Sequence, residues 1–244
     1  MIKIKLLAST AIASLFIATN AFSQTNNFTG LSLALTGSAV GSSSKNSVNL
    51  GGLGSSDIVL LPTDNTPGKT NFIPGADVSY GFAINNNFVM GIGASYDFSK
   101  TKIGGMNLLV IDAVSEDTYE LKLDNELQDH YSLYLQPTYI LNKDSAIFAK
   151  VGRHFAKAKF NISANGLGVG EGSSLSVLAE SANIEGWGYG LGLKTFLTSN
   201  LFVQAEAGVV HYEKWSIGDE MGGGDIFSFK PKTINGTISI GYKF

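Results

Sequence analysis

The last twelve residues, 233–244, alternate polar and apolar side chains with a period of two and end on an aromatic residue. Successive side chains of a β-strand point to opposite faces, so this segment would present one apolar face and one polar face. The apolar face would consist of Ile234, Ile238, Ile240, Tyr242 and Phe244. A strand of this kind at the end of the chain indicates a bacterial outer-membrane β-barrel, in which apolar faces contact lipid.

The beginning of the chain indicates export. Two lysines precede an apolar run over residues 6–18, and the small residues Ala21 and Ser23 follow. This order of charge, apolar run and small residues is typical of a secretory signal peptide. We predict that a signal peptide over residues 1–23 is removed, after Ser23 or after Ala21, leaving one domain over residues 24–244.

Composition favours strands as the membrane-crossing elements. No later segment approaches the roughly 18 uninterrupted apolar residues of a spanning helix. The chain has 29 Gly, 15 Phe and 9 Tyr, with 15% charged residues, and such a composition is typical of a strand-rich membrane protein. Of its 17 basic residues two precede the cleavage site, which leaves 15 against 20 acidic residues and no basic character for binding nucleic acid.

The spacing of alternating segments predicts an all-β, eight-stranded, antiparallel, up-and-down transmembrane barrel. Eight segments of spanning length lie near 29–40, 73–84, 88–99, 129–141, 146–158, 184–196, 201–213 and 232–244. Compact polar turns at 85–87, 142–144 and 198–200 alternate with long segments at 41–72, 100–128, 159–183 and 214–231. Short periplasmic turns and long extracellular loops are expected of such barrels, and an even strand count places both termini in the periplasm. Ten strands remain an alternative if part of the first or second loop forms another hairpin.

The residues around the last turn and at the C-terminus carry a family resemblance. The segments 186–196, 201–209 and 241–244 resemble the OmpA/OmpX-like and opacity-type superfamily of eight-stranded outer-membrane barrels. The resemblance implies that the barrel assembly machinery recognises the C-terminal strand, with Ile240, Tyr242 and Phe244 as its signal, and inserts the protein into the outer membrane. The resemblance does not extend to the peptidoglycan-binding domain of the full OmpA plan, so it does not imply anchoring to the cell wall.

Charged residues on the predicted lumen face form the clearest candidate site. They are Asp77, Asp97, His130, Lys150, Lys194 and Glu206. An eight-stranded barrel has an interior that side chains can fill, and buried charges there must pair. We therefore expect Lys150, Lys194 and Glu206 to form an ion-pair network that plugs the lumen, with a gated pathway or a small-ligand site as the alternative.

A second candidate site is a belt of cations on the outer face, at the extracellular ends of two strands. Its members are Lys100, Lys102, Arg153, Lys157 and Lys159. Such a belt could bind lipopolysaccharide phosphates through charge-assisted hydrogen bonds. The alternative is ordinary snorkelling of long cationic side chains at the membrane edge.

His130 and Ser132 have the spacing of the His-x-Ser arrangement in outer-membrane lipid A deacylases. A hydrolase would also need an acid to orient the histidine, and no acid follows at a convincing position. Side-chain parity points both residues into the lumen, so we expect a hydrogen-bonded pair that fills space. The chain has no Cys and only 3 His, and no cluster has metal-ligand spacing, so neither a metal nor a cofactor is expected.

The sequence therefore favours a monomeric, non-enzymatic barrel in the outer membrane, with a structural or surface-interaction role carried by four extracellular loops. Partners would be outer-membrane lipids, lipopolysaccharide and a host or surface ligand that binds the loops. The first loop includes an apolar patch at 58–62 that could contact a partner. The alternatives are a narrow channel for small solutes and, less favoured, a lipid hydrolase.

Overall fold

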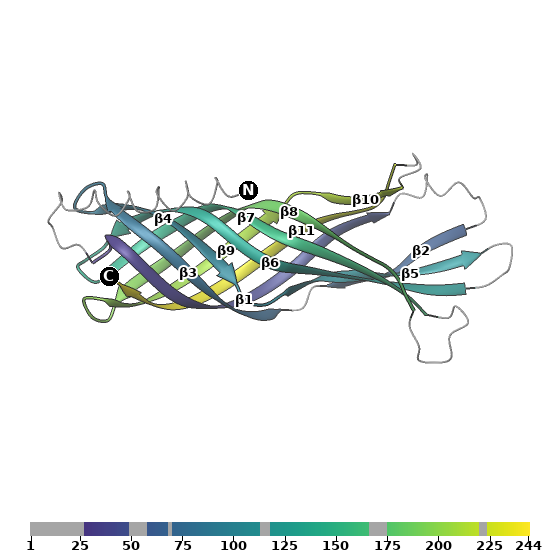
Figure 1. Ribbon diagram of the computed structural model, residues 1–244, viewed down its shortest axis with the longest axis horizontal. Helices are drawn as coiled ribbons and strands as arrows, with labels where there is room; N and C mark the ends of the chain where they lie inside the picture. The colour runs from purple at the N-terminus through teal and green to yellow at the C-terminus, as the bar shows by residue number, and fades with distance from the viewer. Residues whose placement is uncertain (1–26, 49–57, 68–69, 113–117, 166–174, 220–223) are drawn as a thin grey trace, which may run out of the picture.

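The computed structural model describes residues 27–48, 58–67, 70–112, 118–165, 175–219 and 224–244 as an elongated barrel of strands (Figure 1). The strands are β1 (Gly30–Val48), β2 (Ile58–Pro67), β3 (Asn71–Ala83), β4 (Phe88–Asp97), β5 (Thr101–Asp112), β6 (Thr118–Ile140), β7 (Ser145–Asn165), β8 (Leu175–Phe196), β9 (Leu201–Tyr212), β10 (Trp215–Asp219) and β11 (Gly224–Lys243). No helix in the described part of the chain is long and apolar enough to cross a membrane. The predicted signal peptide lies outside the described residues.

Eight of these strands close into a ring. Hydrogen-bonded neighbours follow the order β1, β3, β4, β6, β7, β8, β9 and β11, and β11 pairs with β1 to close the barrel. Every pairing is antiparallel. The predicted eight-stranded up-and-down barrel is confirmed.

The other three strands lengthen existing positions in the ring. β4 pairs with the part of β6 near the turn at 142–144, and β5 pairs with residues 118–127 farther along the same edge of β6. β2 pairs with β5, and β10 pairs with the first residues of β11. The described strands therefore form a barrel that is eight strands around, and not the ten-stranded barrel of the alternative prediction.

The three predicted turns connect strands at one end of the barrel and are stabilised by their own side chains. Asn85 Oδ1 accepts a hydrogen bond from the backbone N–H of Asn87 at 2.9 Å, and Asn142 Oδ1 accepts from Ser145 N–H at 2.9 Å. In the third turn, Thr198 Oγ1 accepts from Leu201 N–H at 3.0 Å. These contacts explain why short polar residues reverse the chain here. The C-terminus lies at the same end (Figure 1).

The strands are much longer than a membrane crossing requires, which differs from the predicted loops. β6, β7, β8 and β11 have 23, 21, 22 and 20 residues, whereas about 9 to 11 residues cross a bilayer. The predicted loop segments are thus largely paired strands wherever they are described. Their Gly-, Ser- and Asn-rich sequences do not look like strands, because neither face meets lipid there. Inward positions such as Leu123 and Phe160 are nevertheless fully buried. The patch at 58–62 forms part of β2.

The outer surface of the barrel carries an apolar band. Its exposed members include Leu33, Leu35, Val78, Ile84, Ile92, Leu133, Leu135, Ile147, Leu191, Leu193, Ile238 and Ile240. Aromatic side chains near the strand ends, such as Tyr96, Phe98, Tyr131 and Trp187, are also exposed. Buried positions on the same strands are often polar, including Ser132, Gln136 and Lys194. The predicted assignment of apolar side chains to the outside and polar ones to the lumen is confirmed.

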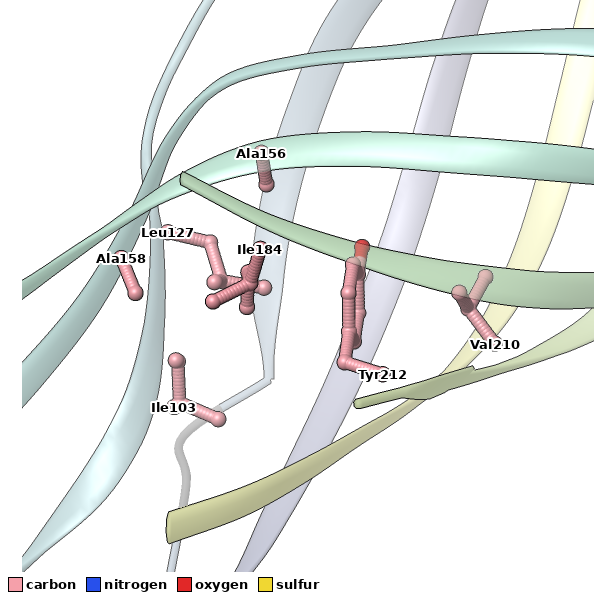
Figure 2. Close-up of a cluster of buried hydrophobic side chains, with 7 residues drawn as sticks. All are labelled: Ile103, Leu127, Ala156, Ala158, Ile184, Val210 and Tyr212. Carbon is pink, nitrogen blue, oxygen red and sulfur yellow. The ribbon is translucent and has the colours of Figure 1, made fainter. Parts of the chain in front are cut away.

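Two apolar layers lie inside the barrel. Phe28, Val89, Ile140, Ala146, Phe196 and Phe202 form one layer beside the short turns. Ile103, Leu127, Ala156, Ala158, Ile184, Val210 and Tyr212 form the other, farther along the strands (Figure 2). We call them the turn-side layer and the outer layer.

Candidate functional site in the barrel lumen

A polar layer lies between the turn-side layer and the outer layer. On β7, Lys150 and His154 lie between Ala146 of the turn-side layer and Ala156 of the outer layer. Because apolar side chains lie on both sides of them, these polar groups are largely shielded from bulk water and must satisfy one another.

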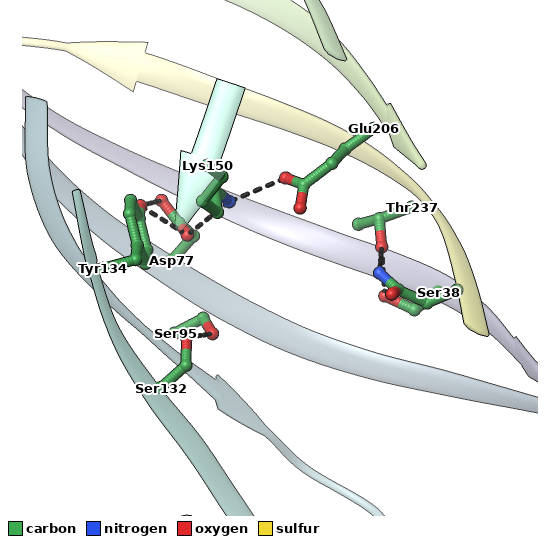
Figure 3. Close-up of polar contacts among 9 residues, drawn as sticks. Ser38, Asp77, Ser95, Ser132, Tyr134, Lys150, Glu206 and Thr237 are labelled. Carbon is green, nitrogen blue, oxygen red and sulfur yellow. Dashed lines mark hydrogen bonds and ion pairs between the residues drawn. The ribbon is translucent and has the colours of Figure 1, made fainter. Parts of the chain in front are cut away.

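Lys150 is the centre of the first polar cluster (Figure 3). Its Nζ lies 2.7 Å from Glu206 Oε2 and 3.9 Å from Asp77 Oδ2. The Tyr134 hydroxyl donates to Asp77 at 2.8 Å, and the ring of Tyr134 lies 4.2 Å from Lys150 Nζ. One cation thus contacts two carboxylates, and the tyrosine hydroxyl supports the second of them.

Glycines make room for this cluster. A Cβ atom at Gly190 would lie 2.8 Å from Glu206 Oε1, and one at Gly93 would collide with the Tyr134 hydroxyl. The period-two glycines of β8 therefore occupy the crowded lumen face, where neighbouring strands supply the large polar side chains.

Lys194 lies apart from this cluster, although the sequence predicts it in the same network. Its side chain is 6% exposed, and its Nζ lies 3.7 Å from the ring centroid of Phe202 and 5.6 Å from that of Phe196. Within the described part of the chain, no carboxylate lies within ion-pair distance of it. The reason is its position among the rings of the turn-side layer, below Lys150 and Glu206.

Two histidines and an aspartate form a second polar cluster just inside the outer layer. His130 Nδ1 lies 2.7 Å from Asp97 Oδ2, and His130 Nε2 lies 2.9 Å from His154 Nδ1. The two imidazole rings are stacked with centroids 5.1 Å apart. Asp97 is thus an acidic partner of His130 that local sequence spacing does not reveal, because the two residues meet only across strands.

A bulge in β6 separates His130 from the outer part of the strand. The register with β7 shifts between Gln128 and Tyr131, and Asp129 has a φ of 51°. On the side of the bulge toward the turn at 142–144, the buried residues of β6 have even numbers, as Ser132 does. On the other side they have odd numbers, as Leu127 does. Period-two parity alone cannot locate such a shift.

Ser132 does not complete a hydrolytic arrangement. Its Oγ lies 2.7 Å from Ser95 Oγ, and the side chain is 2% exposed (Figure 3). Both ring nitrogens of His130 are engaged by other partners. A cavity of about 90 Å³ reaches these residues and has room for only a few water molecules. The described residues contain no group of three or more ligating side chains that could hold a metal ion.

Two of the five residues of the predicted cation belt on the outer face form ion pairs with carboxylates. Lys100 Nζ lies 2.8 Å from Glu126, and Arg153 contacts Glu185 at 2.6 Å and Glu213 at 2.8 Å. Lys102 and Lys159 lie directly opposite Glu126 in the strand registers, whereas Lys157 lies opposite Gln128. The sequence pattern identified these cations but not the acids among them.

Two residues of the predicted assembly signal, Ile240 and Tyr242, lie on the outward face of β11, and Phe244 follows its last residue. Ile240, Tyr242 and Phe244 are 52%, 48% and 65% exposed, and the rings of Tyr242 and Phe244 lie 5.1 Å apart.

The model of the outer membrane protein beta-barrel domain family matches residues 9–244. The chain belongs to this family. It is an integral protein of the bacterial outer membrane, and the end that carries the short turns and the C-terminus faces the periplasm, as in other such barrels. No curated protein sequence matches the chain significantly.

Solved structures with a similar fold include three outer-membrane proteins. Ail, the attachment invasion locus protein of Yersinia pestis, is 18% identical with a TM-score of 0.43, and the alignment covers 88% of this chain and 99% of that chain. The outer membrane protease OmpT from Escherichia coli is 12% identical with a TM-score of 0.47, covering 93% and 100%. OprG from Pseudomonas aeruginosa is 13% identical with a TM-score of 0.43, covering 90% and 98%.

Proposed function

We propose that this family member is a non-enzymatic, monomeric surface protein, in which a sealed transmembrane barrel carries an extracellular extension that contacts other surfaces. The observation that carries the proposal is the length of the strands, because β6, β7 and β8 are each about twice as long as a membrane crossing requires. A strand-built extension is more rigid than free loops and presents a persistent surface for recognition.

The lumen supports a scaffold more than a channel. Two apolar layers enclose the polar layer, and Lys150 is paired with Glu206 and Asp77 between them. A channel for polar solutes would need a continuous aqueous path, and the cavity of about 90 Å³ is too small to provide one. The hydrolase alternative lacks support as well, since Ser132 contacts Ser95 and not His130.

Two measurements test this proposal. We expect the mature protein, folded in detergent and placed in a planar bilayer, to give no discrete channel openings. As a control that the assay can detect a pore, the variant Phe28→Ala/Phe202→Ala removes two rings of the turn-side layer and should increase leakage. Discrete openings of the unaltered protein would contradict a sealed barrel.

The surface role is tested on cells. Shortening the β5–β6 hairpin by joining Gly105 to Asp124, which face each other in the register, through a two-residue turn removes the tip of the extension and leaves the barrel intact. We expect this variant to reach the outer membrane at normal abundance but to lose adherence to other cells. Equal adherence of both proteins would show that this part of the extension is not the contact surface.

We also propose that Ile240, Tyr242 and Phe244 form the signal read by the barrel assembly machinery, because these side chains are exposed on the last strand, where a partner can reach them.

A further inference from the structure

A group of cations that the sequence analysis did not single out lies on the outer face of β1, β9 and β11. Lys45 lies directly opposite Lys230 in the register of β1 and β11, and Lys232 lies directly opposite His211 in the register of β11 and β9. Lys45, Lys230 and His211 are exposed and Lys232 is half-buried. We call Lys45, Lys230 and Lys232 the lysine ladder.

The ladder has no acidic partner within the described part of the chain. None of the ion pairs there includes Lys45, Lys230 or Lys232. Glu213, just after the end of β9 and two residues beyond His211, is bonded to Arg153. Like charges directly opposite each other in a sheet are destabilising, so an anion placed between the ammonium groups would offset this repulsion.

The position of the ladder along β11 specifies what kind of anion can reach it. Ile234, 58% exposed, belongs to the lipid-facing apolar row on this strand, and Lys232 is the next residue outward on that face. His211, opposite Lys232, is also directly opposite Trp187, which is 50% exposed. Exposed aromatic side chains at the ends of membrane strands lie at headgroup level. The ladder therefore begins where lipid phosphates lie.

We propose that the lysine ladder binds the phosphate groups of lipopolysaccharide in the outer leaflet. Three ammonium groups on neighbouring strands can form charge-assisted hydrogen bonds to phosphate oxygens while the row at Ile234 contacts acyl chains. The site depends on the membrane location of the barrel and not on the surface role proposed above.

The cation belt of β5 to β7 provides the comparison. There Glu126 bonds Lys100 and lies directly opposite both Lys102 and Lys159. A phosphate approaching that face meets a carboxylate directly opposite two of the lysines, whereas no carboxylate lies directly opposite a ladder lysine in the described registers, and Glu213 near by is bonded to Arg153. We therefore expect the ladder to be the stronger of the two faces for phosphate.

Two variants with the same change in charge test this expectation. The ladder variant is Lys45→Gln/Lys230→Gln/Lys232→Gln, and the matched control is Lys102→Gln/Lys157→Gln/Lys159→Gln. Each mature protein is folded in detergent, its fold is verified by heat-modifiable migration on a gel, and its affinity for purified lipopolysaccharide is measured. At roughly fivefold per lysine near a charged membrane surface, the ladder variant should bind about 100-fold more weakly, and the control should lose much less.

Phosphate specificity is tested with lipopolysaccharide from which the phosphate groups have been removed. The unaltered protein and the ladder variant should bind this lipid equally. Equal losses in the two triple variants, or a ladder effect that persists without phosphate, would overturn the proposal. If the triple ladder variant does not fold, Lys230→Gln alone should weaken binding about fivefold, and an unchanged affinity would overturn it equally. Neither channel openings nor cell adherence is read in this experiment, so its failure would leave the surface role untouched.

Discussion

Two buried lysines in the lumen of this barrel should respond in different ways to the same substitution. Lys150 contacts the carboxylates of Glu206 and Asp77, whereas Lys194 lies among aromatic rings without a carboxylate in the described part of the chain. The side chains of Lys150, Glu206 and Asp77 are only 15%, 11% and 14% exposed. Replacing each lysine by Met preserves most of its volume and removes its charge.

The expected magnitudes follow from what each substitution leaves behind. Lys150→Met leaves two carboxylates without their cation, and removing one partner of a buried pair costs about 3 to 5 kcal/mol of unfolding free energy. We expect a value near the lower end because the cluster keeps slight solvent contact and Asp77 keeps its hydrogen bond from Tyr134. Lys194→Met loses cation–π contacts of about 2 kcal/mol but also removes a desolvated charge, so its net change should stay within about 1 kcal/mol.

Urea unfolding of the protein in lipid vesicles, followed by tryptophan fluorescence, measures both free energies, provided that the slope against urea concentration is unchanged. Adding Glu206→Gln to Lys150→Met removes one of the uncompensated carboxylates and should recover part of the loss. The reasoning would be refuted if Lys194→Met destabilised the barrel as much as Lys150→Met, or if the double variant lost the sum of both single effects.

Three further predictions concern the backbone and the last residue. Gly93→Ala should destabilise the barrel by about 1 to 3 kcal/mol, because the added Cβ would meet the Tyr134 hydroxyl. Gly236→Ala should be neutral or slightly stabilising, because no atom lies within 4 Å of the added Cβ. Urea unfolding distinguishes the two variants. Asp129→Gly should stabilise the barrel by roughly 0.5 to 1 kcal/mol by relieving a φ of 51°, and an unchanged midpoint would show that Asp is unstrained there. Phe244→Ser should lower the amount of protein in the outer membrane without changing refolding in detergent, as measured by cell fractionation and gel migration; a loss in both assays would indicate a stability defect instead.

Local pattern was sufficient for the strands that cross the membrane. The alternation at 233–244 and the polar turns at 85–87, 142–144 and 198–200 predict strands and reversals that the structure contains. Lipid on one side and a filled lumen on the other force a strict period of two, so the signal is strong. Outside the membrane that constraint is absent. The sequence pattern therefore predicts loops where the structure has the extracellular parts of β6, β7 and β8.

Contacts across the lumen could not be predicted, because they depend on register and closure. Parity placed Asp97, His130 and Lys150 in the lumen, but it did not show that Asp97 bonds His130 or that Asp77 joins Lys150. The bulge beside Asp129 reverses parity in the outer half of β6 without any distinct local signal.

The sequence by itself determined the fold class, the lipid-facing side chains and the set of charges inside, because each depends on a period of two within single strands. Only the tertiary structure decided which charges pair, that eight and not ten strands close the ring, that apolar layers lie on both sides of the polar layer, and that Lys45 and Lys230 lie side by side. These are relations between strands far apart in the chain, and closing the ring fixes them through shear and register that no single segment encodes.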